Sequence, residues 1–151
     1  MLTQTCRSFL TGAATLAMFA GLSFAGNHHA LNGTWQLVPS LSELHGEPGI
    51  QTGTVTINDR EGNIYVQRNF DFDGANLSTS ATFSTDARAN TTIKEPGFKS
   101  KAKWEGDSLK VTTTRDGMTT VEHYSLREDG DLTLHVDRTG HQPETLYFQH
   151  Q

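Results

Sequence analysis

The sequence predicts an all-β protein, folded as an antiparallel up-and-down meander barrel of eight to ten strands. Residues 26–151 contain 17 threonines, and valine, isoleucine, phenylalanine, tyrosine and tryptophan are spread along the same stretch. Such β-branched and aromatic side chains suit a pleated, half-buried surface. Turn signals containing glycine recur at the spacing of about 8–12 residues that is typical of sandwiches and barrels. No segment after residue 25 shows a convincing helical period.

Residues 1–25 are predicted to be a signal peptide that is cleaved and does not belong to the fold. Arg7 precedes an apolar run, and Ser23-Phe24-Ala25 fits the small-x-small pattern of a signal-peptidase site. We therefore expect an exported protein, periplasmic or secreted. Residues 26–30 would form a flexible tail, and residues 31–151 a single β-barrel domain.

Composition excludes several classes of function. Cys6 is the only cysteine and would leave with the leader, so the mature chain would have no disulfide, thiolate metal ligand or cysteine nucleophile. Without Arg7 the formal net charge changes from −5 to −6. An acidic domain without a basic cluster argues against nucleic acid and anionic membranes as partners. After residue 25 no segment is long and apolar enough to be an integral membrane span.

The strands follow one another between the turn signals. Clear turns are Asp71-Phe72-Asp73-Gly74, Glu105-Gly106-Asp107 and Glu128-Asp129-Gly130-Asp131. Candidate strands lie near residues 33–38, 52–59, 62–70, 77–86, 89–95, 98–105, 108–115, 118–127, 131–138 and 144–150. Short serial connections favour a meander that closes into a barrel, which would remove exposed sheet edges. A sandwich is the alternative, but it usually needs longer Greek-key connections.

The inward face that the alternation predicts is not wholly apolar. Arg68 is in register with Ile64, Val66 and Phe70, and Glu122 shares a face with Tyr124. A solid core would not hold such groups, because a buried unpaired charge costs several kcal/mol. A hollow, ligand-holding interior would accommodate them. The alternative is a register shifted by one residue, which would turn Arg68 and Glu122 to solvent.

Motifs near both ends of the domain resemble known barrels. Gly33-Thr34-Trp35 on the first strand is similar to the start of lipocalins and of fatty-acid-binding proteins. Trp104-Glu105-Gly106-Asp107-Ser108-Leu109 resembles the Trp-x-Gly-x-x-Leu hairpin of the latter. The whole of residues 31–151 resembles, more closely still, small exported bacterial proteins described as lipocalin-like. The resemblance implies a calycin-type barrel.

The lipocalin resemblance also implies a structural cluster at the closed end of the barrel. Gly33 would allow a close approach where the strand bends, and the indole of Trp35 would plug the cylinder. Lipocalins stack an arginine from the last strands over that tryptophan, a cation–π contact. Arg138 is our candidate for this role, which would be structural and would not involve a ligand.

The chain departs from fatty-acid-binding proteins where those proteins hold the carboxylate of their ligand. Tyr124 and Leu146 stand in place of the two arginines, and Phe148 in place of the tyrosine. Fatty-acid binding is therefore not carried over from the resemblance. Arg68 could replace the missing cation from another strand, provided that it points inward.

Metal binding finds little support in the sequence, and no cofactor is expected. His123, His135 and Asp137 could meet near a hairpin and bind Zn²⁺, although an outward-facing strand surface explains the same residues. Asn69-x-Asp71-x-Asp73-Gly74 resembles half of a calcium loop, but a hairpin turn accounts for it and the twelfth position is Ser80. If cleavage follows Ala25, the new N-terminus with His28 at its third position could bind Cu(II) or Ni(II).

The sequence favours a non-catalytic binder of a small hydrophobic or amphipathic molecule held in the barrel. The candidate cavity residues are Arg68, Phe70, Phe83, Trp104, Leu109, Glu122 and Tyr124. Two alternatives remain open: a protein-interaction or structural module with a solid barrel, and a hydrolase or isomerase using Glu122 with Tyr124. No catalytic motif supports the latter. The sequence names neither the ligand nor the oligomeric state.

Overall fold

A computed structural model describes residues 28–44, 49–84 and 97–151, and these contain nine strands and two short 3₁₀ helices. The predicted signal peptide and the predicted strand 89–95 lie outside the described residues, and the leader stays a prediction. The elements in chain order are η1 (His28–Leu31), β1 (Gly33–Leu37), η2 (Pro39–Leu41), β2 (Ile50–Arg60), β3 (Asn63–Phe72), β4 (Ala75–Ser84), β5 (Phe98–Glu105), β6 (Ser108–Arg115), β7 (Met118–Leu126), β8 (Leu132–Arg138) and β9 (Glu144–His150). None of the helices among the described residues is long and apolar enough to cross a membrane.

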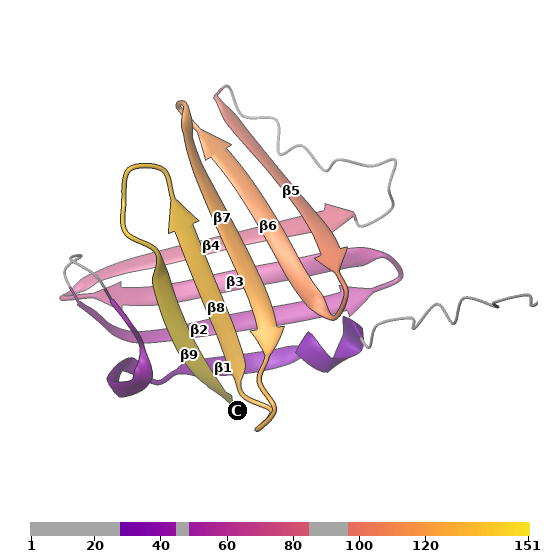
Figure 1. Ribbon diagram of the computed structural model, residues 1–151, viewed down its shortest axis with the longest axis horizontal. Coiled ribbons are helices and arrows are strands. Elements are labelled where there is room, and N and C mark those ends of the chain that lie inside the picture. The colour runs from indigo at the N-terminus through magenta and orange to yellow at the C-terminus, as the bar shows by residue number, and fades with distance from the viewer. Residues whose placement is uncertain (1–27, 45–48, 85–96) are drawn as a thin grey trace, which may run out of the picture.

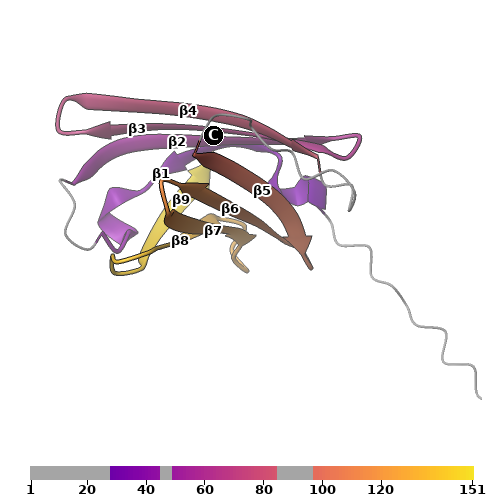
Figure 2. The ribbon, with the colours of Figure 1, turned by 90° about the horizontal axis from the view of Figure 1, so that it is seen from above.

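The nine strands form one antiparallel sheet in the order β4-β3-β2-β1-β9-β8-β7-β6-β5. Because β1 pairs with β9, the sheet curls until β1–β4 face β5–β9, as Figures 1 and 2 show. Within the described residues no ladder joins β4 to β5, so the barrel is nearly closed. The all-β meander barrel predicted from the sequence is confirmed. Among the described residues the sheet ends at β4 and β5, and full closure stays a prediction.

Tight turns connect the strands, and the hairpin between β3 and β4 shows the geometry. Asp73 (φ 46°) and Gly74 (φ 90°) are the only residues between the paired Phe72 and Ala75. Positive φ at both central residues is the geometry of a type I′ hairpin turn. The amide of Gly74 also donates to Oδ1 of Asp71 at 3.2 Å. The motif that resembled half of a calcium loop is therefore this turn.

One end of the barrel is closed by apolar packing. The indole of Trp35 is 2% exposed, and its Nε1 donates to the carbonyl of Leu31 in η1 at 3.0 Å. Gly33 (φ 142°) lies against the imidazole of His150, where a Cβ atom would collide with the ring. Trp35 and Gly33 thus lie at the closed end, as the resemblance implied.

Arg138 does not stack on Trp35, and that prediction was wrong. The aromatic ring against Trp35 is His150, which meets it edge-on with ring centroids 4.8 Å apart. Strand β8 begins near this end, since Leu132 pairs with Phe148, and it then runs away from it. Six residues of strand span about 20 Å. Arg138 therefore lies at the opposite end of the barrel, which we call the turn end because the β3–β4, β6–β7 and β8–β9 connections lie there.

Candidate functional site

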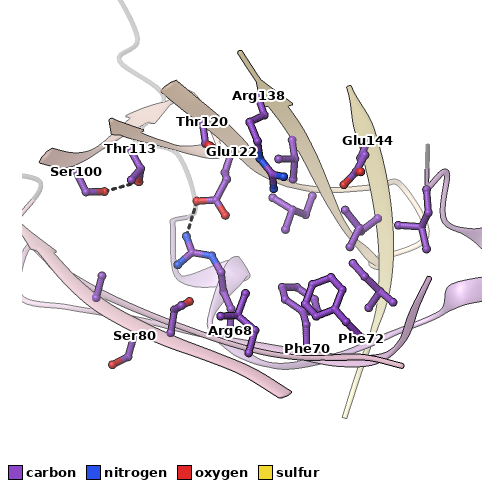
Figure 3. Close-up of a pocket in the computed structure, with 18 of the residues that line it drawn as sticks. Arg68, Phe70, Phe72, Ser80, Ser100, Thr113, Thr120, Glu122, Arg138 and Glu144 are labelled. Carbon is purple, nitrogen blue, oxygen red and sulfur yellow. Dashed lines mark hydrogen bonds and ion pairs between the residues drawn. The ribbon is translucent and has the colours of Figure 1, made fainter. Parts of the chain in front are cut away.

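The barrel interior is hollow toward the turn end. The cavity there has a volume of about 430 Å³. Apolar side chains from both halves of the sheet make up most of its wall, among them Phe70, Phe72, Phe83, Leu134, Val136 and Leu146. A few polar side chains also face it, as Figure 3 shows: Arg68, Ser100, Thr113, Thr120, Glu122, Arg138 and Glu144.

Strand alternation explains why these polar groups face the cavity. Successive side chains of a strand point to opposite faces, so Arg68 shares the inner face of β3 with Val66 and Phe70. On β7, Thr120 and Glu122 share the inner face in the same way. The predicted register is therefore correct, and the alternative that turned Arg68 and Glu122 outward does not hold.

Gly53 makes room for one wall of the cavity. It lies opposite Phe70 in the β2–β3 ladder and is buried. A Cβ atom at this position would collide with the Phe70 ring. The absent side chain therefore lets Phe70 lie across the strand, where it lines the cavity.

A hydrogen-bonded triad of Arg68, Glu122 and Tyr124 crosses the interior from one half of the sheet to the other. Nη2 of Arg68 donates to Oε2 of Glu122 at 2.6 Å, and Nε donates to the Tyr124 hydroxyl at 2.7 Å. That hydroxyl in turn donates to Oε1 of Glu122 at 3.2 Å. The side chains of Arg68 and Glu122 are only 13% and 14% exposed. The triad carries no net charge, because one guanidinium offsets one carboxylate.

Burial and mutual contacts keep the Arg68 guanidinium charged and the Tyr124 hydroxyl neutral. Burial disfavours the charged form of Arg68, but its contacts with Tyr124 and Glu122 outweigh it, and the pKa of the guanidinium is raised. Burial also raises the pKa of the Tyr124 hydroxyl well above its ordinary value, although the nearby positive charge of Arg68 opposes this shift. Tyr124 therefore remains a neutral hydrogen-bond donor and acceptor.

Four of the seven predicted cavity residues line the cavity: Arg68, Phe70, Phe83 and Glu122. Tyr124 does not line the cavity: its ring is fully buried in the core, and only its hydroxyl contacts Arg68 and Glu122. Leu109 is also wholly buried and does not line the cavity, so its predicted role as a ligand contact was wrong.

Trp104 does not line the cavity either. It lies at the end of β5, near the closed end of the barrel. Its indole stacks on the imidazole of His28 with the ring centroids 4.1 Å apart. The proposed role of His28 in an N-terminal copper or nickel site needs residues 26 and 27, which lie outside the described residues, and stays a prediction.

Sequence analysis missed several residues that the structure places in the cavity wall. Arg138 follows Leu134 and Val136 on the inner face of β8, and this pattern could have identified it. Thr120 shares a face with Glu122 and could have been found in the same way. Ser100 and Thr113 share a hydrogen bond of 2.8 Å across β5 and β6, a pairing that no local motif indicates.

His123 and His135 lie directly opposite one another in the β7–β8 ladder. Their neighbours Glu122 and Leu134 point inward, so the two imidazoles belong to the outer face. In the part of the chain that the structure describes, no cluster of three or more histidine, cysteine, aspartate or glutamate residues could hold a metal ion.

No protein-family model matches the sequence, and no curated protein matches it either. Solved structures do share its architecture. The fluorescent protein UnaG superposes with a TM-score of 0.61 at 18% identity, covering 80% of this chain and 96% of its own. A fatty-acid-binding protein of Schistosoma mansoni in complex with arachidonic acid gives a TM-score of 0.59 at 17% identity, covering 83% and 99%.

A third match is the secretory abundant heat soluble protein 4 of Ramazzottius varieornatus, with a TM-score of 0.56 at 15% identity. It covers 81% of this chain and 95% of its own. The fold is that of a calycin-type β-barrel. At these identities the likeness concerns the fold alone, and the closer resemblance to exported bacterial lipocalin-like proteins stays a prediction.

Proposed function

We propose that this protein is a non-catalytic binding protein for a small hydrophobic or amphipathic molecule, and that it acts outside the cytoplasm. The observation that carries the proposal is the cavity of about 430 Å³. Ligand pockets typically enclose about 300–1,000 Å³ and combine apolar walls with a few polar groups that fix orientation. This cavity has both properties. Export of the protein depends on the predicted signal peptide.

The fold comparison supports a binder without naming its ligand. The related Schistosoma mansoni barrel holds arachidonic acid, which is a long amphipathic molecule. In this chain Leu146 and Phe148 stand where the fatty-acid-binding group is expected to place polar anchors, and both are buried apolar residues of the core. The only inward arginine near the middle of the barrel, within the described residues, is Arg68, and Glu122 already neutralises it.

The two alternatives are less well supported. A structural module with a solid barrel would not leave a hollow of this size. A hydrolase or isomerase using Glu122 and Tyr124 would need one of them as a proton acceptor or donor. Both are engaged with Arg68, and the raised pKa of Tyr124 makes its hydroxyl a poor acid near neutral pH.

Two matched substitutions of alanine by phenylalanine test the proposal. Ala81 lines the cavity, whereas Ala75 is exposed beside the β3–β4 turn. Ala81→Phe would occupy part of the cavity and should weaken binding of a neutral solvatochromic dye and of dodecanol by about tenfold or more. Ala75→Phe should leave both affinities unchanged. Chemical denaturation would confirm that both variants fold.

Two results would contradict the proposal. One is the absence of saturable binding of the dye, dodecanol and dodecanoate by the unmodified protein at micromolar concentrations. The other is equal affinity in Ala81→Phe and the unmodified protein. Export has its own test: after expression in a secreting host, the mature N-terminus should be Gly26, and retention of residues 1–25 would refute the predicted leader.

A further inference from the structure

A second hollow of about 420 Å³ lies at the turn end, next to the cavity. Its basic side chains are those of Arg115 at the end of β6, Arg138 at the end of β8, and His141 in the β8–β9 connection. No aspartate or glutamate is among the described residues that line it. The formal net charge of the chain is −5, so most of its surface repels anions. A hollow that is lined by two arginines and no carboxylate would attract them.

The two hollows adjoin. Thr113, Thr120, Phe98 and Arg138 line both of them. Figure 3 shows Arg138 extending from β8 into the cavity on the side where Thr120 lies. One molecule could therefore place an apolar part in the cavity and a polar part in the second hollow, with the two threonine hydroxyls along its path.

Arg138 has no ion-pair partner among the described residues. Glu144 also lines the cavity and lies six residues after Arg138 in the sequence. The two side chains nevertheless form no ion pair within 4.0 Å. Arg115 lies over the Phe98 ring at 5.2 Å from its centroid, a contact that leaves its hydrogen-bond donors available. Both guanidinium groups can thus donate to an incoming oxyanion.

Arg68 is in the opposite situation. Its guanidinium donates to Glu122 at 2.6 Å and to Tyr124 at 2.7 Å. An anion placed beside it would also lie beside the Glu122 carboxylate, and like charges in a poorly solvated interior repel strongly. The middle of the barrel therefore disfavours an anionic group, while the turn end favours one.

We propose that the ligand is an amphiphile with an anionic oxyanion head group, bound with its head outward. The head would lie in the second hollow between Arg138 and Arg115, and the apolar part would extend into the cavity toward Phe83. This inference rests on the proposed function and adds the ligand class and orientation. A carboxylate, a sulfate or a phosphate monoester satisfies the same chemistry, because guanidinium groups bind each of them in bidentate fashion.

Three ligands with the same chain separate the contribution of the head group from that of the tail. Dodecanoate and dodecyl phosphate carry an oxyanion, and dodecanol does not. We expect both anions to bind the unmodified protein more tightly than dodecanol, with an advantage that falls as salt is added. Whichever anion binds tighter identifies the preferred source of the oxyanion. Displacement of a neutral solvatochromic dye measures all three affinities.

Arginine variants locate the head group. Arg138→Gln should weaken both anions by about tenfold or more, as expected on losing charged hydrogen bonds. The same substitution should leave dodecanol nearly unchanged. Arg115→Gln should act in the same direction. Arg60→Gln is the matched control: it removes the same charge from an exposed position at the far end of β2, and it should change no affinity.

The outcomes separate this inference from the proposed function. If dodecanol binds and Ala81→Phe weakens it, but Arg138→Gln and Arg115→Gln leave the anions unaffected, the head-outward orientation is wrong and the binding function stands. If Arg138→Gln weakens dodecanol as much as the anions, the arginine acts through the cavity shape and the inference also fails. If the unmodified protein binds none of the ligands, the proposed function fails first.

Discussion

The two ends of the barrel are built from the same strands but differ in what fills them. At the closed end, the core side chains Leu31, Trp35, Leu132 and Phe148 are each at most 2% exposed. At the turn end, the same strands carry threonines, arginines and exposed apolar residues around two hollows. Strand β8 alone shows the change, since it begins at the buried Leu132 and ends at Arg138 in the cavity wall.

This difference separates stability from binding along the barrel axis. Close packing at one end supplies dispersion contacts and apolar burial. The other end forgoes part of that packing and presents polar groups to a hollow. The triad of Arg68, Glu122 and Tyr124 lies between the two, where a fully satisfied polar network can be buried at lower cost than unpaired charges.

The largest effect is expected at the closed end. Phe148→Ala should lower the free energy of unfolding by about 3–5 kcal/mol, because it leaves a cavity in a tightly packed region. Phe72→Ala, at the turn end, should cost less than half of that, because the Phe72 ring already borders a hollow. Urea denaturation of both variants measures the comparison. Equal losses would mean that the turn end is packed as tightly as the closed end.

Local patterns predicted most of this architecture. The ranges 98–105, 108–115 and 144–150 were predicted with the bounds that β5, β6 and β9 have, because a glycine-containing turn precedes each of them. The inward direction of Arg68 followed from its period-two relation to Val66 and Phe70. Such features depend on neighbouring residues only, and a single sequence contains them.

Features that depend on three-dimensional arrangement were missed or misassigned. Arg138 was assigned to Trp35 because its type fitted a lipocalin role, but the direction of β8 places the two at opposite ends. Trp104 was expected in the cavity as an apolar contact, whereas its position at the end of β5 places it beside η1. The order of the nine described strands depends on pairings between strands, which no local motif encodes.

The next largest loss of stability is expected at the triad. Its size tests whether the triad is buried from water. Glu122→Ala should lower the free energy of unfolding by about 2–4 kcal/mol, because it leaves Arg68 charged in a poorly solvated interior. Glu105→Ala is the matched control, since Glu105 forms an ion pair of similar length, 2.7 Å, with Lys103 on the surface. Solvent screens that pair, so its loss should have little measurable effect.

Thermal or urea denaturation of the two glutamate variants decides between a buried and a solvated pair. A loss in Glu122→Ala no greater than that in Glu105→Ala would show that water reaches the centre of the barrel freely. The cavity would then extend through the triad, and the contrast between the two ends would be weaker than the side-chain burial of Arg68 and Glu122 indicates.

The smallest effect is expected at alkaline pH and comes from Tyr124. Its pKa is raised in the folded protein, mainly by burial, above the ordinary value of about 10 for an unfolded chain. Above pH 10 the unfolded chain releases this proton while the folded protein retains it. The stabilising contribution is therefore complete below pH 10 and declines as pH rises toward the folded pKa, by up to about 1.4 kcal/mol per pH unit.

Tyr124→Phe removes this titrating group and should reduce the alkaline slope of unfolding free energy against pH by about one proton. Tyr147→Phe is the control, because Tyr147 is only partly buried and the ordinary slope should remain. If the slope is unchanged in Tyr124→Phe, the Tyr124 hydroxyl ionises as easily in the folded protein as in the unfolded chain. Water would then solvate the Tyr124 hydroxyl, and the water-free part of the barrel would lie only between the triad and the closed end.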